Sequence, residues 1–406
     1  MAVYGFLMML YITGLQTIQK DVLEAAVLDG CTGIKKIIYI QLPLLMPTIT
    51  INLFVSIAGA FKAFDIPLSL TGGGPANSTQ TIALNIYNDA FGSFKMGYGS
   101  AKSIILFLLV GIIALIQLKI TRKMGGTDVK WKNEGMNKTV VLKCILWLCL
   151  GIIFILPVFL IIMNAFKPNN DILTSFISFP KSLYLENFSE AMRIMNFWTV
   201  FRNTLFVTVC TVIVASAVSF MSAYGISHLP QKTGDKLYTL FVVGQIIPFH
   251  AVMIAISMLS TKLGLTNTHL GLIIFYSGFY TSFGVMTYVG FLKSVPRELE
   301  EAAAIDGAGP FRTMVQIILP LVKSTTVTIG ILFFLWTWND LLLPSIMISD
   351  VNLRTITVNL YMFKSSTNAQ WNLLIAGLVV SMIPIIIIYI VGQKHITSGL
   401  TAGAVK

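Results

Sequence analysis

Two short stretches of this chain carry the same pattern of acidic, small and glycine residues. One runs from Glu24 to Gly30 (EAAVLDG) and the other from Glu301 to Gly307 (EAAAIDG). Adjacent alanines keep one face of a helix small, so that another surface can approach closely. A glycine ends a helix because it takes a left-handed conformation at little cost. This is the chemistry of a docking surface, and we expect no covalent reaction from it.

The similarity between the two stretches continues beyond the glycines. Ten residues after each glycine the chain reads Ile40-Gln41-Leu42-Pro43 and Ile317-Ile318-Leu319-Pro320, so that eight residues match at one fixed spacing. A proline can open a helix, where its missing N–H does no harm. One copy alone would indicate a capped turn between two helices, whereas two copies with matched spacing favour a shared function.

The composition is that of a membrane protein. Of 406 residues, 55% are hydrophobic and only 11% are charged, whereas a soluble domain carries roughly 25% charged residues. Nucleic-acid binding could explain the net charge of +11, but the basic residues lie mostly between apolar runs. Orientation in membrane lipid is the simpler cause, and no nucleic-acid partner is expected. The four cysteines lack metal-ligand spacing and the four histidines form no cluster, so no metal site is indicated.

Long apolar runs predict an all-α polytopic membrane protein. A helix needs about 20 apolar residues to cross the hydrocarbon core. The first run could also be a secretory signal, but it lacks a basic start and a small-residue cleavage site. About nine spans are predicted, three and then six: 1–18, 43–66, 100–120, 140–163, 203–226, 238–260, 268–292, 317–345 and 373–393.

Basic residues orient these spans. The stretch from Lys119 to Lys138 is short, basic and next to two spans, so it is predicted to be cytoplasmic. Counting outward from it puts both repeats, in 19–42 and 293–316, on the cytoplasmic side together with the C-terminus. The longer loops on the outside also carry lysines and arginines, so the charge bias is incomplete.

The full spacing, EAA-x3-G-x9-I-x-L-P, resembles the signature of ABC-importer permease subunits. In that family this loop forms the coupling helix, which sits in a cleft on a separate ATPase subunit and passes on its motion. The resemblance implies ABC ATPase subunits and an extracytoplasmic solute-binding protein as partners, with no cofactor on this chain and ATP bound only by the ATPase. It assigns ATPase coupling to Glu24, Ala25, Ala26, Asp29, Gly30, Glu301, Ala302, Ala303, Asp306 and Gly307.

Further runs look like the two permease subunits of carbohydrate importers of the maltose type. Those similar to the first subunit are Phe61, Phe64-Asp65, LTGGGP at 70–75, Thr79 and Thr81. Those similar to the second are NAFK at 164–167, NTL at 203–205, WND at 338–340 and the tail 399–406. The resemblance implies the C-terminal part of a first permease unit in 1–125, a basic cytoplasmic linker in 126–139 and a complete second unit in 140–406.

The first unit departs from the family pattern. The family's first subunit normally has several more spans ahead of the coupling loop, and Gln19 stands where proline is usual. Met136 follows a polar linker and resembles a start codon. We therefore expect a truncated first unit fused to a second one. A full-length partner permease would complete it, and an inactive fusion product is the alternative.

A substrate path is predicted from charged and aromatic residues near the outer ends of two spans. Intramembrane charges are costly and often functional, and aromatic faces pack on apolar surfaces such as those of sugar rings. Paired or solvated carboxylates and interfacial anchoring of the rings are the competing explanations. Pro157, Pro248 and Pro384 are expected to kink helices around the path. The path residues are Phe61, Phe64, Asp65, Trp336, Trp338, Asn339 and Asp340.

These observations predict a permease, not an enzyme, in the plasma (inner) membrane. Gly72-Gly73-Gly74-Pro75 is followed by no Gly-Lys-Ser/Thr, so no nucleotide site is indicated and ATP hydrolysis is expected in a separate chain. Sugars or oligosaccharides are the expected substrates. Glycerol phosphate, a polyol or another small solute is the alternative within this class. An ion-driven transporter would need charged residues in mid-span, and no convincing set is present.

Overall fold

The computed structural model describes residues 11, 15, 18, 20–61, 63–121, 155–292, 295–363 and 370–402. Within these ranges every regular element is a helix and none is a strand, which confirms the predicted all-α class. Four helices are long and apolar enough to cross a membrane, by length and composition. They are α8 (Met96–Thr121), α12 (Phe197–Ser227), α15 (His269–Leu292) and α22 (Trp371–Ala402). They match four of the predicted spans.

Two other predicted spans are bent helix pairs. The predicted span 238–260 consists of α13 (Gln231–Ile246) and α14 (Phe249–Lys262), which meet at 95°, so the kink expected at Pro248 is present as a full break. Pro248 lacks an N–H, and the residue before it takes an extended conformation (φ −62°, ψ 117°), so the helix cannot continue. Counting each bent pair as one span gives up to six spans among the described residues.

The second bent pair corrects the predicted span 317–345. Residues Pro310–Leu321 and Lys323–Asn339 meet at 80°, with the break at Val322. The earlier segment contains α17 (Pro310–Thr313), η3 (Met314–Ile318) and α18 (Leu319–Leu321), and α19 (Lys323–Asn339) follows. The predicted span 317–345 therefore includes residues 317–321, which lie before the bend. It also runs past Asn339, where α19 ends before α20 (Leu342–Met347) begins.

The remaining predicted spans are described only in part. α5 (Met46–Phe61) has 16 residues, which is fewer than the number of residues a straight span needs. The helix Ile155–Ala165 is the described portion of 140–163. Almost all of 1–18 and the whole linker 126–139 lie outside the described residues. The count of nine spans stays a prediction.

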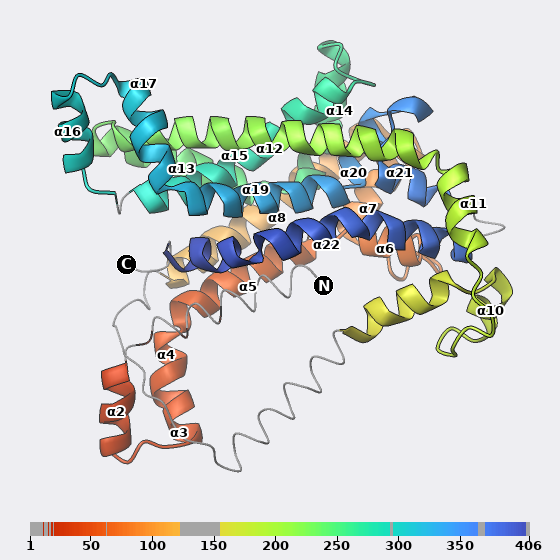
Figure 1. The fold of residues 1–406 in the computed structure, drawn as a ribbon, viewed down its shortest axis with the longest axis horizontal. Helices are drawn as coiled ribbons and strands as arrows, with labels where there is room; N and C mark the ends of the chain where they lie inside the picture. The colour runs from red at the N-terminus through yellow and green to blue at the C-terminus, as the bar shows by residue number, and fades with distance from the viewer. Residues whose placement is uncertain are drawn as a thin grey trace.

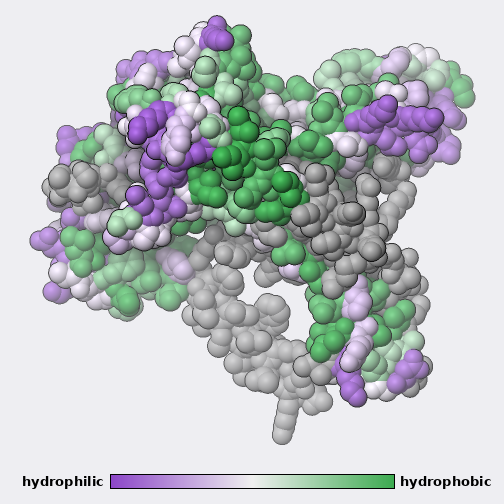
Figure 2. All heavy atoms as spheres, turned by 180° about the vertical axis from the view of Figure 1, so that it is seen from behind, coloured by the Kyte–Doolittle hydropathy of each residue, from purple (hydrophilic) through white to green (hydrophobic). Residues whose placement is uncertain are grey.

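The core forms where α12 packs against α15. A Cβ atom on Gly284 would lie 2.2 Å from Ser219 Oγ, so the two helix backbones approach closely at this point. Small residues permit such contact between membrane helices, where van der Waals packing drives association. Phe220, Tyr288 and Phe333 are buried beside this contact. On the outside, exposed hydrophobic side chains gather in the middle of the face seen in Figure 2, with hydrophilic residues toward its two sides.

The internal repeat extends well beyond the sequence motif. Glu24 and Glu301 lie 277 positions apart, and most helices of the two copies are related by that same spacing. The pairs with both bounds 277 apart are η1 (Ile37–Gln41) with η3, α4 (Leu42–Leu44) with α18, and α6 (Asp65–Leu70) with α20. Pairs at similar spacing are α2 (Lys20–Leu28) with α16 (Glu298–Ile305), α5 with α19, α7 (Ile82–Tyr87) with α21 (Ile356–Tyr361), and α8 with α22.

The two copies place corresponding elements at one end of the molecule. Figure 1 shows α2 and α16 toward the left end, where α12 and α15 also finish, and α10 (Asn169–Thr174) and α11 (Glu186–Ile194) at the opposite end. The short helices α3 (Ile34–Lys36), η2 (Asn88–Gly92) and η4 (Val351–Leu353) complete the described elements. Both repeats thus lie on one side, as the loop count predicted. Which side is cytoplasmic stays a prediction.

Candidate functional site

The candidate site consists of two loops, each a short helix ended by a glycine. We call them the first EAA loop (residues 20–33) and the second EAA loop (297–310). In the first, Gly30 has φ +71° and its N–H donates to Val27 O at 3.1 Å, while the N–H of Cys31 donates to Ala26 O at 2.7 Å. This pair of bonds is a Schellman motif, which satisfies carbonyls that the end of a helix leaves without partners.

The second EAA loop has the same hydrogen bonds. Gly307 has φ +77° and donates to Ala304 O at 3.1 Å, and Ala308 donates to Ala303 O at 2.9 Å. No atom lies within 4 Å of a Cβ built on either glycine, so backbone conformation, and not space, requires glycine at Gly30 and Gly307. Asp29 and Asp306 are exposed at these helix ends.

The two alanines of each loop face different ways. Ala26 and Ala303 are both 5% exposed, so they pack beneath their helices. Ala25 and Ala302 are exposed, and each carries a small side chain on the outer face. Glu301 is exposed and Glu24 is half-buried. The outer face of each loop therefore offers a flat surface with a carboxylate at its edge.

Large apolar side chains surround this face. Ile305, the last residue of α16, is 87% exposed, and Phe311 of α17 is 71% exposed. Val22 and Leu299, which correspond in the repeat, are also exposed. Grouped apolar side chains on an exposed loop indicate a surface that binds another protein.

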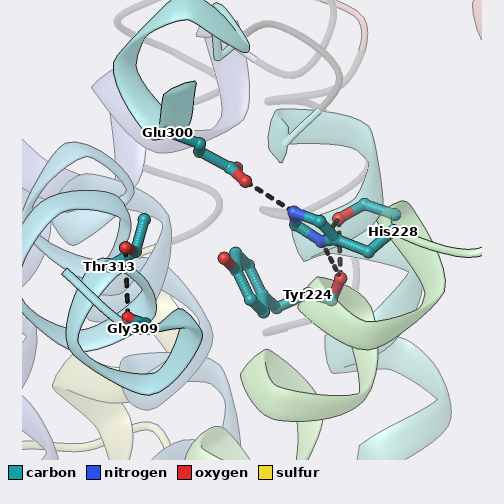
Figure 3. Close-up of polar contacts among 6 residues, drawn as sticks. Tyr224, His228, Glu300, Gly309 and Thr313 are labelled. Atoms are coloured by element: carbon teal, nitrogen blue, oxygen red, sulfur yellow. Dashed lines mark hydrogen bonds and ion pairs between the residues drawn. The ribbon is translucent and has the colours of Figure 1, made fainter. Parts of the chain in front are cut away.

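A polar contact joins the second EAA loop to a membrane helix. His228 Nε2 lies 2.5 Å from Glu300 Oε2, and His228 Nδ1 lies 2.8 Å from Tyr224 O, as Figure 3 shows. His228 directly follows α12, whereas Glu300 is in the first turn of α16. Arg297 and Glu301 line a pocket of about 430 Å³ beside this contact. Sequence reasoning missed this pair, since 72 residues separate the partners.

On its other side the second EAA loop leads into α17. Thr313 Oγ1 donates to Gly309 O at 3.2 Å within α17 (Figure 3). Gly309 has an extended backbone and precedes Pro310, which opens α17. The second EAA helix contacts α17 on this side and the end of α12 on the other.

Two of the predicted substrate-path rings belong to the core in this structure. Trp338 is 2% exposed, donates from Nε1 to Ser381 O at 3.2 Å and stacks on Phe334 with ring centroids 5.3 Å apart. Phe64 is 2% exposed and lies 5.1 Å from the Tyr87 ring. Neither ring has a free face here.

Trp336 and Asp340 lie in a separate aromatic group. Trp336 is 38% exposed, and its ring is 5.1 Å from Phe283 and 5.5 Å from Tyr280. The Asp340 carboxylate accepts from Tyr276 OH at 2.7 Å and from the Leu343 N–H at 3.1 Å. Its carboxylate is therefore hydrogen-bonded within the protein, and its role in the path stays a prediction.

The other predicted path residues do not join that group. Phe61 is half-buried against the cluster that contains Phe64. Asn339 is exposed and donates to Leu335 O at 2.7 Å within its own helix. Asp65 starts α6, and its side chain lies outside the described residues. Within the described part of the chain, no group of three or more His, Cys, Asp or Glu residues could hold a metal ion.

Comparison with known proteins places these loops in a family. The family model described as "Binding-protein-dependent transport system inner membrane component" matches residues 1–126 and 215–401, which together are more than half of the chain. The chain belongs to this family of inner-membrane transport permeases. Both EAA loops lie within the matched stretches of this permease.

Relatives of the permease match different shares of its length. The probable starch degradation products transport system permease protein AmyC of Thermoanaerobacterium thermosulfurigenes is 39% identical over 261 residues, 64% of this chain and 95% of AmyC. The multiple sugar-binding transport system permease protein MsmG of Streptococcus mutans is 34% identical over 260 residues, 63% of this chain and 93% of MsmG. AmyD, the second such permease of T. thermosulfurigenes, is 40% identical over 119 residues, 29% of this chain and 41% of AmyD.

A solved structure has a similar fold. A chain from the crystal structure of a bacterial ABC transporter that imports the acidic polysaccharide alginate superposes with a TM-score of 0.54 at 22% identity. The match covers 64% of this permease and 99% of that chain. At this identity the likeness concerns the fold alone.

Proposed function

We propose that this chain is the membrane-spanning component of an ATP-driven importer, in which the two EAA loops dock onto separate ATPase subunits. The observation that carries the proposal is the matched pair of loops. Both end in a Schellman motif around a glycine with positive φ, and both lie at the same end of the molecule. Two equivalent docking helices suit two equivalent ATPase subunits.

Coupling would run through the contacts of the second EAA loop. A force on α16 reaches α12 through the Glu300–His228 contact and reaches α19 through α17, η3 and α18. Both routes lead into helices of the core. ATP is bound and hydrolysed in the partner subunits, and this chain carries out no covalent chemistry itself. The side of the molecule that carries the loops and the end of α22 is then cytoplasmic.

Sugars or oligosaccharides are the proposed substrates. The support is that AmyC and MsmG, which this chain matches over more than nine-tenths of their length, are named for starch degradation products and multiple sugars. An extracytoplasmic solute-binding protein would deliver the sugar at the end of the molecule that carries α10 and α11. The units 1–125 and 140–406, joined by the linker 126–139, are proposed on the repeat and on the two matched stretches.

The docking role is tested by co-purifying a sugar-importer ATPase with the permease in detergent. Gly307→Val puts a β-branched residue at φ +77°, which such residues rarely adopt, so the loop must change shape. Gly309→Val is the matched control, because Gly309 has φ −72° and no atom within 4 Å of an added Cβ. We expect at least a tenfold loss of bound ATPase in the first variant and little change in the second.

Equal retention of the ATPase by both glycine variants would contradict the docking role of the second EAA loop. Ile305→Asp gives an independent test, since its 87% exposed side chain can be changed without disturbing the core. Each variant is first shown to elute as a single species in size-exclusion chromatography. Uptake of labelled maltodextrin into vesicles containing the bound complex then tests the substrate class.

A further inference from the structure

The loop between α10 and α11 exposes a row of large apolar side chains. We call it the α10–α11 loop (residues 175–185). Ile177, Phe179 and Leu183 are 79%, 75% and 68% exposed, and Phe176, Tyr184 and Leu185 are exposed as well. The sequence of the loop, SFISFPKSLYL, contains no acidic residue and one basic residue, Lys181. Exposed apolar side chains gathered in this way mark a surface that binds something apolar.

The helix that follows this loop has a charged outer face instead. Glu186, the first residue of α11, is exposed, and the side chains of the Arg193–Glu190 pair are 73% and 44% exposed. Charged residues of both signs are typical of a surface in water. The change from apolar to charged takes place between Leu185 and Glu186, so the loop and the helix next to it face different surroundings.

Buried polar side chains bind the backbone at the start of the loop. Asn164 and Lys167 are each 0% exposed, and both donate to Phe176 O, at 2.9 Å and 3.2 Å. Toward the other end, the Tyr184 N–H donates to Phe166 O at 3.0 Å. A backbone beside lipid must satisfy its polar groups internally, since hydrocarbon offers them no partner. These bonds meet that condition and leave the apolar side chains on the outside.

The apolar surface of the loop continues onto an apolar helix. The helix Ile155–Ala165 precedes α10 and leads into it at the end of the molecule opposite to α16 (Figure 1). Ile155, Phe159 and Ile162 are 67%, 45% and 45% exposed on this helix. The Phe159 ring lies edge to face with the Phe179 ring, with the centroids 6.2 Å apart. One apolar surface therefore runs from the helix to the loop.

We propose that the α10–α11 loop lies in the headgroup region of the bilayer, with Ile177, Phe179 and Leu183 among the first acyl carbons of phospholipid. Aromatic rings are favoured at this depth. Lys181 reaches lipid phosphates with its amine while its methylenes stay in apolar surroundings. Phospholipid is the occupant because the surface continues an apolar helix and carries no carboxylate. The proposal goes beyond the proposed function and depends only on the chain's membership of a membrane permease family.

The test measures the depth of single spin labels in nanodiscs of phosphatidylcholine and phosphatidylglycerol. The label is placed by Ile177→Cys in the full chain, with its four native cysteines replaced by serine. Val351→Cys is the matched control, because Val351 is also apolar and 53% exposed but follows Asp350, at the same end of the molecule. Phe159→Cys gives the value for the apolar helix. We expect the ratio of collisions with oxygen to collisions with a water-soluble nickel complex to be several-fold higher at 177 than at 351, and close to that at 159.

Two outcomes overturn the proposal. A ratio at position 177 equal to that at 351 means that the loop lies in water. Few collisions with either reagent at 177 mean that protein covers the loop. Labelling by a membrane-impermeant maleimide in the same nanodiscs is a second readout, and position 177 should react several-fold more slowly than position 351. ATPase binding is measured on the same variants, so that failure of the docking role is seen separately.

Discussion

His228 and Glu300 form a contact between two segments that sequence separates widely. Both side chains are partly exposed, at 45% and 24%, so the pair contributes little to stability. The pair is important because of where it lies, since it links the second EAA helix to the end of α12. We expect His228→Phe to keep the ATPase bound while maltodextrin uptake falls several-fold, as measured in vesicles.

The matched control for that variant is Arg193→Gln. It breaks the Arg193–Glu190 pair, which has a 2.7 Å contact, is more exposed at 73% and 44%, and lies in α11 at the other end of the molecule. Uptake should be unchanged. An equal loss of uptake in both variants would mean that surface charge, and not this link, matters.

The surroundings of Lys167 lead to a prediction of how stability changes with pH. Lys167 is fully buried, donates to Ser175 O at 3.0 Å and to Phe176 O at 3.2 Å, and burial lowers its pKa from the usual 10.5. The folded state then binds fewer protons than the unfolded state as the pH falls below 10.5. Stability therefore rises with pH toward that value.

We expect Lys167→Met to remove this pH dependence of thermal unfolding in detergent just below pH 10.5. The variant should lose little stability, because Ser175 O keeps the Ser178 hydroxyl and Phe176 O keeps the Asn164 amide as donors. A slope that persists in the variant would show that another group causes it.

At the scale of elements, α12 and α15 approach each other closely in the core. Gly284→Ala brings a Cβ within 2.2 Å of Ser219 Oγ, which should cost about 1–3 kcal/mol by forcing the helices apart. Gly278→Ala is the control in the same helix, since nothing lies within 4 Å of its added Cβ. Thermal unfolding in detergent measures both.

A rescue sharpens this test. Ser219→Gly removes the atoms that the new methyl meets, so the Gly284→Ala/Ser219→Gly double variant should regain part of the lost stability. If the double variant is no more stable than Gly284→Ala alone, the clash is not the cause.

Sequence patterns predicted these elements unevenly. Apolar length was sufficient to find α8, α12, α15 and α22. The break at Pro248 follows from the missing N–H, but the 95° angle depends on what α13 and α14 pack against. The π-helical turns η1 and η3 leave no sign in the spacing of apolar residues. The bend at Val322, which follows η3 and α18, was therefore not expected.

At the scale of the whole molecule, the repeat motif predicted where both EAA loops lie and how their backbones end. The placement of both EAA loops at one end agrees with the loop count, and the glycines adopt the expected left-handed conformation. The similarity of TIALNIY at 81–87 to TITVNLY at 355–361 does not follow from the motif, because these segments are 274 positions apart and the motif repeats at 277. The buried state of Trp338 was not predictable, since its partners Phe201 and Ser381 come from two distant helices.

The two Schellman motifs also bear on stoichiometry. Their hydrogen bonds join the same relative positions, with glycine φ values of +71° and +77°. A partner that recognises this backbone meets one shape twice, whatever the differences in the surrounding side chains. Two identical copies of one ATPase subunit can therefore receive the two EAA loops, although the rest of the two permease units differs.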